Sequence, residues 1–369
     1  MADHHGSSPS AATDTSKAPP PPGSTRILLG DNPFDVAPTL DLLHEVRMDV
    51  PSWSETQFFQ VWSPDSSAGV FVHTGRWPGD LDLWWAQVIA MLPDGTLLVD
   101  RSWGRAVDSS GPATGNLRVH CQQPLKNWRI RFDGAGEPSD LATMAGGPIG
   151  STHARAFSFD IELQAIAPVW DMHGALGIHD VGWASRHHTQ GMRSRGVLQV
   201  EGLNPIELSG VGCRDHSSGP RILTDVGGLQ FFVVVFPESG RVANGLVNWR
   251  RSGEVAHRVY TIQQAGRCEI GFDVSVTGLA ELSTHAPHNV VVEMRGASSH
   301  LYRAQWLHGY TLTLLEPNLN VNGAVVDAQD DPLFITQGAF RVVADDGEIG
   351  WGVVERDYRR SMLPAPQPR

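Results

Sequence analysis

The central part of the chain alternates apolar and polar positions with a period of two over many short stretches. Asn116–Cys121 and Ala156–Ala165 alternate most regularly. Leu83–Leu92 and Thr96–Arg101 flank a Pro-Asp-Gly turn at residues 93–95, a pattern typical of a β-hairpin. Because side chains alternate between the two faces of a strand, this patterning predicts β-structure rather than helices.

The same patterning continues through the second half of the chain, where glycine (39 residues) and proline (25 residues) punctuate it as in sandwiches and barrels. Helical patterns are few: one lies at Asp41–Val46 and a weaker one at residues 277–282. We therefore expect a mainly β protein built from antiparallel meanders. The predicted strands of this half are Gly196–Glu201, Gln230–Phe236, Arg241–Trp249, His257–Gln263, Val290–Arg295, Thr311–Glu316 and Gly338–Val343.

The length and the breaks in the pattern predict two lobes between two short tails. Residues 1–25 are rich in Ser, Ala and Pro and are expected to be disordered, as are residues 363–369. Alternation weakens in the glycine-containing stretch Met172–Ser185, where we place the boundary between the lobes. The predicted lobes are residues 26–183 and residues 184–362.

Composition limits the classes of function. Hydrophobic residues make up 41% of the 369 residues, enough for a large core, and the formal net charge of -12 argues against a nucleic-acid partner. The three cysteines are far apart, which is unfavourable for a disulfide framework. No signal-peptide pattern and no stretch long enough to span a membrane occurs, so we expect a cytoplasmic protein; the sequence leaves the oligomeric state open.

The densest cluster of ionisable residues lies in segment 210–221, which reads GVGCRDHSSGPR. If this segment is a strand, Arg214 and His216 face one way, whereas Asp215 and Ser217 face the other. A carboxyl group that faces a cavity has a raised pKa unless it is paired, as a general acid at neutral pH requires. The alternative is an Arg–Asp ion pair that closes a turn.

A second candidate element is Arg186-His187-His188-Thr189-Gln190. One histidine could serve in acid–base chemistry or hydrogen bonding in the same cavity, or both could be ordinary structural residues. Histidines and cysteines at zinc-binding spacings are not evident, and neither a Walker loop nor a dinucleotide-binding GxGxxG element occurs, so we predict no metal and no cofactor. Cys213 beside Arg214 is a weaker candidate for a nucleophile.

Tryptophan is unusually frequent, with 12 residues against 4 tyrosines. Core packing explains most of them, because tryptophan buries a large apolar area. A subset could line an apolar pocket, where aromatic faces stabilise a developing cation. The candidates for this role are Trp103, Trp170 and Trp249.

The GxGxRDHSxGPR motif, with a His-x-x-Gln element upstream, resembles the AttH-like family related to hydroxyneurosporene synthase (carotenoid 1,2-hydratase) and to lipocalin-like pericyclases and terpenoid cyclases. Further landmarks occur in the expected order: Trp53–Phe59, the hairpin at residues 92–95, Pro124–Arg129 and Gly350–Glu355. The resemblance implies two consecutive lipocalin-like (calycin) β-barrel lobes and a cavity for an apolar substrate.

The resemblance also implies roles for individual residues. Asp215 matches the family's proton-donating aspartate, His187 the assisting histidine and Gln190 the family's glutamine. We also place Arg214 and His216 in the predicted catalytic site, where they would fix the geometry of the motif, and Gln190 in the predicted substrate-binding site. The sequence departs from the common RDHSWG pattern, because Ser218 stands where the family has tryptophan.

These observations leave three hypotheses open. The first is a cofactor-independent enzyme (a hydratase or lyase, an isomerase or a cyclase) that acts on a terpenoid, polyene or similar hydrophobic molecule. The second is a lipocalin-like carrier that binds such a molecule without transforming it. The third is a structural protein in which the motif only braces the two lobes.

Overall fold

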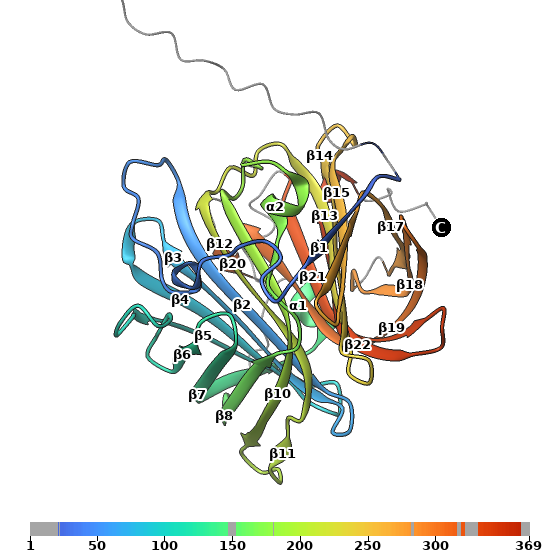
Figure 1. The fold of residues 1–369 in the computed structure, drawn as a ribbon. Coiled ribbons are helices and arrows are strands. Elements are labelled where there is room, and N and C mark those ends of the chain that lie inside the picture. The colour runs from blue at the N-terminus through green and yellow to red at the C-terminus, as the bar shows by residue number, and fades with distance from the viewer. Residues whose placement is uncertain are drawn as a thin grey trace, which may run out of the picture.

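The computed structural model describes residues 21, 23–146, 153–179, 181–281, 284–315, 319–321 and 331–362. These residues form two long antiparallel sheets, each curled into a barrel-like lobe (Figure 1). The prediction of a mainly β, two-lobed fold is therefore confirmed. The predicted tails at 1–25 and 363–369 lie outside the described residues, apart from residues 21 and 23–25.

The first sheet has the strand order β11-β10-β12-β2-β3-β4-β5-β7-β6, with β8 bridging β7 and β10 and with β9 beside β10. The predicted hairpin is the pair β4/β5. The strands are β2 (Trp53–Ser63), β3 (Ala68–Trp77), β4 (Asp80–Met91), β5 (Leu97–Arg105), β6 (Leu117–Gln123), β7 (Asn127–Ser139), β8 (Arg155–Ala165), β9 (Trp170–Asp171), β10 (Arg186–Val200), β11 (Ile206–Glu207) and β12 (Gly210–Pro220).

The second sheet has the order β1-β16-β15-β14-β13-β22-β21-β19-β18-β17, with β20 beside β19. The strands are β1 (Thr25–Leu29), β13 (Val226–Phe236), β14 (Arg241–Arg250), β15 (Val255–Gln264), β16 (Arg267–Gly271), β17 (Asp273–Ala280), β18 (Pro287–Arg295), β19 (Ser299–Leu315), β20 (Leu319–Val321), β21 (Leu333–Ala344) and β22 (Ile349–Arg359).

Helices are short, and both helical predictions are wrong. The chain forms a 3₁₀ turn at Pro38–Asp41 in place of the helix expected at Asp41–Val46. Asp41 is completely buried there, where it meets an arginine of β12, and this contact outweighs the weak local helical pattern. Residues 273–280 form β17, because pairing with β18 overrides a short local preference. The α-helices of the described chain are α1 (Leu141–Gly146) and α2 (Met172–Leu176).

The change from one sheet to the other lies between β12 and β13, not at residues 183 and 184. The stretch Met172–Ser185 forms α2 and turns, and the chain then returns to the first sheet, where β10 pairs with both β8 and β12. The RDH motif on β12 therefore belongs to the first sheet. Conversely, β1 pairs with β16 in the second sheet. A glycine-rich break thus marked a connection within a lobe rather than a boundary between lobes.

The apolar core of the described residues has three large clusters and a small one, formed by Phe334 and Tyr358. One cluster fills the first lobe, a second fills the other lobe, and a third lies where β2, β10 and β12 meet β13 and β22. Neighbouring residues on one strand enter different layers: Phe58 lies between the lobes, whereas Phe59 lies inside the first lobe. Strands at this junction are therefore buried on both faces, as β2 is along its whole length.

Candidate functional site

A cavity of about 140 Å³ lies in the layer between the two lobes. Strands β2, β3, β10 and β12 form one side, and β13, β14, β21 and β22 form the other. A cavity of this size holds roughly one benzene-sized ring. The lining residues are Thr56, Phe58, His73, Trp183, His187, Asp215, Ser217, Arg221, Leu223, Val226, Leu229, Phe231, Leu246, Asn248, Leu333, Ile335, Gln337, Glu355 and Asp357.

The motif on β12 divides between two environments by strand alternation. Asp215 and Ser217 line the cavity, whereas Arg214 and His216 point to the opposite face and bind acidic residues there. This is the orientation that the sequence pattern predicted. One half of the motif therefore faces the cavity, and the other half is part of the interior of the first lobe.

Asp215 forms the polar centre of the cavity together with His187. The Asp215 Oδ2 atom lies 3.5 Å from His187 Nε2, and the side chains are only 18% and 12% exposed, respectively. Burial raises the pKa of Asp215 to about 7, although the nearby Arg221 and Arg214 act to lower it. Burial lowers the pKa of His187 to about 3. Asp215 therefore titrates near neutral pH, where His187 is uncharged.

Packing holds the His187 ring in place. Its ring centroid lies 5.6 Å from that of Trp183 and 6.3 Å from that of Phe231, both in edge-on geometry. The His187 Nδ1 atom has no hydrogen-bond partner among the described residues. Because the ring is uncharged and held in place, His187 can form a hydrogen bond with Asp215 rather than a permanent ion pair.

A second acidic group lies on the wall formed by β22. Glu355 and Asp357 are alternate residues of this strand, and both line the cavity. Burial raises the pKa of both carboxyl groups well above the usual range, and for Glu355 the neighbouring Asp357 adds to this effect. Gln337 on β21 donates a hydrogen bond to Glu355 Oε2, and the Tyr310 hydroxyl donates to Gln337 Oε1 at 2.7 Å. This chain of hydrogen bonds orients the Glu355 carboxyl group.

Arg214 and Gln190, which the sequence proposed for catalysis and substrate binding, do not reach the cavity. Arg214 forms a buried ion pair of 2.7 Å with Asp41 and packs over the ring of Trp128. It also donates to Gln190 Oε1, while the Gln190 amide donates to the backbone carbonyls of residues 125 and 167. These residues brace the first lobe and hold β12 against β10.

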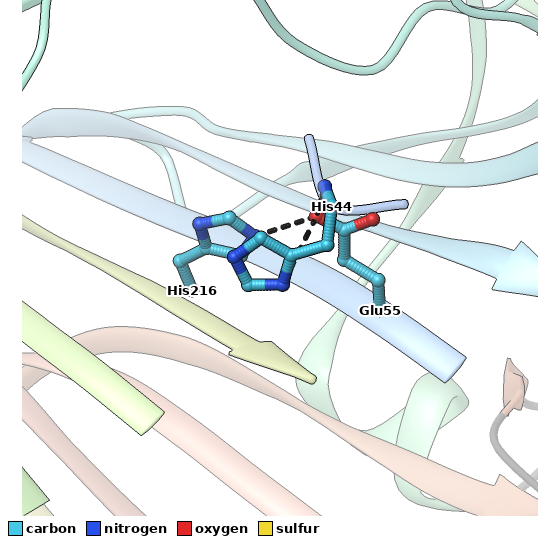
Figure 2. Close-up of side chains that lie close together, drawn as sticks. All are labelled: His44, Glu55 and His216. Carbon is cyan, nitrogen blue, oxygen red and sulfur yellow. Dashed lines mark hydrogen bonds and ion pairs between the residues drawn. The ribbon is translucent and has the colours of Figure 1, made fainter. Parts of the chain in front are cut away.

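His216 belongs to a second buried network on the same face, shown in Figure 2. Its Nε2 atom lies 2.8 Å from Glu55 Oε1, and its ring stacks on that of His44. Arg76 Nε donates to Glu55 Oε2 at 2.8 Å, and the His44 backbone N–H donates to Glu55 Oε1. Although burial acts to raise it, the hydrogen bond from His216 and the nearby cations hold the Glu55 pKa at about 2.

The histidine–glutamate group His44, Glu55 and His216 has the composition of a metal site, with its ligand atoms within 4.8 Å of one another. However, both Glu55 oxygens already accept hydrogen bonds, and one of the donors is the Arg76 guanidinium. A cation in this position would be repelled by Arg76 and would have to displace these donors. The geometry therefore fits a charge-compensated brace better than a metal centre.

The predicted tryptophan walls are replaced by other aromatic residues. Trp103 is 45% exposed and packs against Trp77 at the surface, and Trp249 packs against the core of the second lobe. Trp170 is buried behind Phe231 and does not line the cavity. The aromatic walls of the cavity are Phe58, His73, Trp183, His187 and Phe231.

Ser218, which stands where the resembling family has tryptophan, lies on the far face of β12. Its hydroxyl group is 2.9 Å from His44 Nδ1. The substitution therefore changes the brace behind the strand and leaves the cavity lining as it is. Burial also raises the pKa of the Cys213 thiol well above its usual value, which disfavours the thiolate that a nucleophile requires.

Sequence reasoning assigned no role to several residues of the cavity, above all Arg221, Glu355 and Asp357. Glu355 closes the Gly350–Glu355 landmark, and a carboxyl group follows two positions later. Two carboxylates at this spacing on a strand share one face, which is the signal that could have marked them. The packing of one lobe on the other brings them to Asp215.

The fold and the site define the class: a two-lobed, lipocalin-like β protein with a largely apolar cavity between its lobes into which a few acid–base groups point. The chain belongs to the family DUF7064, a domain of unknown function, whose model matches residues 37–357. A search of curated proteins finds no match. Among the described residues, no helix has both the length and the apolar character needed to cross a bilayer.

Solved structures with a similar fold include an AttH from Nitrosomonas europaea, with a TM-score of 0.55, 13% identity and coverage of 84% of this chain and 93% of the other. Kievitone hydratase from Nectria haematococca matches with a TM-score of 0.52 and 11% identity, over 92% of this chain and 97% of the hydratase. CghA with Sch210972 matches with a TM-score of 0.51 and 11% identity, over 90% of this chain and 98% of CghA. At these identities the similarity establishes the lipocalin-like fold.

Proposed function

We propose that the protein is a cofactor-independent acid–base enzyme of the hydratase or lyase, isomerase or cyclase type, and that its substrate binds in the cavity between the lobes. The observation that carries this proposal is Asp215, a carboxyl group with a pKa of about 7 that lies in a cavity beside an uncharged histidine. A group that holds and releases its proton near neutral pH suits general acid catalysis. The fold of kievitone hydratase is consistent with this class.

In the proposed reaction Asp215 donates its proton to a carbon–carbon double bond or to an oxygen of the substrate. In this step the neutral His187 would donate its Nε2–H to Asp215 Oδ2, 3.5 Å away, so that the other carboxyl oxygen carries the proton toward the substrate. In a hydration, water from solvent then forms the new C–O bond and gives up its proton to a base. The Asp215 carboxylate that remains after the first step can take up this proton, which restores the acid for the next turnover.

The aromatic walls suit a reaction with developing positive charge. Phe58, Trp183 and Phe231 surround the acid–base groups. An aromatic face stabilises a nearby cation by up to roughly 2 kcal/mol when water is excluded. The cavity admits only a ring-sized part of a molecule, so the rest of a longer terpenoid or polyene would extend beyond it.

This proposal is tested by incubating the purified protein with a panel of ring-containing alkenes and tertiary alcohols. Mass spectrometry separates the outcomes: a gain or loss of one water indicates hydration or dehydration, and an unchanged mass with a new retention time indicates isomerisation or cyclisation. A lipocalin-like carrier would return every bound compound unchanged, and this result would contradict the enzyme proposal.

The pH dependence of turnover should follow the Asp215 carboxyl group. Because the protonated form is the active acid and burial raises its pKa to about 7, kcat should be high below pH 7 and fall as the pH rises above it. The expected decrease is about tenfold per pH unit in the alkaline limb. A profile measured from pH 5 to pH 9 checks this, and a rate that increases above pH 7 would contradict the role of Asp215 as the acid.

A further inference from the structure

Arg221 is a buried cation on the cavity wall that lacks an ion-pair partner among the described residues. Its side chain is 93% buried, with a relative exposure of 7%. Its Nη1 atom donates to the Trp183 carbonyl oxygen at 2.8 Å. Its Nη2 atom donates to Thr56 Oγ1 and to the carbonyl and hydroxyl oxygens of Ser217, at 3.3, 3.2 and 3.0 Å. All these acceptors are uncharged.

Three other buried arginines of the described chain form ion pairs with carboxylates, whereas buried Arg359 donates to the backbone carbonyls of residues 223, 226 and 331. Arg214 pairs with Asp41 at 2.7 Å, Arg76 pairs with Glu55 at 2.8 Å, and Arg241 pairs with both Asp346 and Glu348. A buried guanidinium without a counter-ion is costly, because it loses its hydration and gains no opposite charge. Arg221 therefore differs from these three ion-paired arginines.

Among the described residues no carboxyl group of the cavity forms an ion pair with Arg221, although burial lowers the Arg221 pKa to about 10 and nearby Asp215 acts against this. Asp215, Glu355 and Asp357 line the same cavity, and burial favours the protonated, uncharged form of each. A guanidinium has five N–H donors, and two parallel donors match the two oxygens of a carboxylate.

We propose that Arg221 binds an acidic oxygen group of the substrate, such as a carboxylate or an enolate, carried by an otherwise apolar skeleton. This inference rests on the proposed function only in that the substrate occupies the same cavity. Leu223, Leu229 and Leu246 line the cavity and would contact the apolar part. The inference narrows the substrate class from a hydrocarbon terpenoid or polyene to an acidic molecule of which a ring-sized portion enters the cavity.

The test uses benzoate and benzamide, two ring-sized probes of nearly the same shape of which only benzoate is charged near neutral pH. Calorimetric titration of the full chain at pH 6 should show benzoate binding about tenfold more tightly than benzamide, because a hydrogen bond to a charged group is the stronger one. Arg221→Gln should abolish this preference and leave benzamide binding unchanged. Arg221→Lys should retain part of the preference.

The matched control is Arg251→Gln, which removes a solvent-exposed arginine that pairs with Asp331. It should leave the preference for benzoate intact. Equal affinities of the wild-type protein for the two probes, no benzoate binding at millimolar concentration, or a preference that survives Arg221→Gln would each overturn the proposal. The comparison of benzoate with benzamide on the wild-type protein tests the proposal even if a variant fails to fold.

The two proposals fail in different ways. Loss of turnover in Asp215→Asn with the benzoate preference retained supports both of them. If the protein prefers benzoate but transforms no compound of the panel, the Arg221 site is supported and the enzyme proposal is contradicted. Turnover of neutral and acidic substrates at equal kcat/KM retains the enzyme proposal and overturns the role of Arg221.

Discussion

Asp215→Asn is expected to reduce kcat by about 10²–10⁴-fold, which is the usual contribution of a general acid. Asparagine has nearly the same shape as aspartic acid and keeps a hydrogen bond to His187 within reach, but it has no proton to donate. Since Asp215 lies at the centre of the cavity and 3.5 Å from His187, the substitution removes the proton donor with little change in packing. Substrate turnover measured under saturating conditions checks the expectation.

Asp225→Asn is a suitable control for this substitution. Asp225 pairs with Arg250 at the surface, where its side chain is 62% exposed. The control should keep the wild-type rate and the wild-type midpoint of thermal unfolding. Turnover by Asp215→Asn at a near wild-type rate would remove Asp215 from the mechanism, even if the cavity still binds the substrate.

Arg214→Ala is expected to lower the free energy of unfolding by about 3–5 kcal/mol, the cost of removing one partner of a buried ion pair. The substitution leaves the completely buried Asp41 carboxylate without its cation, and it also removes the donor to Gln190 Oε1. The guanidinium over Trp128 is lost as well. Unfolding in urea, followed by tryptophan fluorescence, measures the change.

Arg251→Ala provides the comparison for this loss of stability. Its pair with Asp331 is partly solvated, with the arginine side chain 45% exposed, so its removal should cost less than about 1 kcal/mol. If Arg214→Ala were no more destabilising than Arg251→Ala, the brace on the far face of β12 would be disproved. A large loss of stability in Arg214→Ala would support a structural role for Arg214 and His216, the half of the motif that faces away from the cavity.

Strand alternation was enough to predict how the RDH motif divides between two faces. It placed Asp215 and Ser217 on one side and Arg214 and His216 on the other, as the structure has them. Alternation could not tell which face meets a cavity, because β12 is buried on both sides. The polar partners that fill one face, Asp41 and Glu55, come from distant parts of the chain, and no local pattern identifies them as partners.

The opposite wall of the cavity was beyond sequence reasoning for a different reason. Glu355 and Asp357 come from β22, a central strand of the second sheet, and meet Asp215 only because the lobes pack face to face. Which tryptophan reaches the cavity depends on the same packing. The high frequency of tryptophan in the sequence therefore did not identify Trp183 as the one that lines it. The glycines of Met172–Ser185 similarly gave a break in pattern without showing that both flanking strands join one sheet.

The central claim is that Asp215 is a carboxylic acid that titrates near neutral pH in the cavity between the lobes. The most direct measurement is a ¹³C NMR titration of protein labelled at the aspartate carboxyl carbons, with the Asp215 signal assigned by its absence in Asp215→Asn. The account predicts a midpoint near pH 7, because burial raises the pKa to about 7. A midpoint near 4, the ordinary value for aspartate, would mean that Asp215 is ionised at neutral pH and would contradict the account.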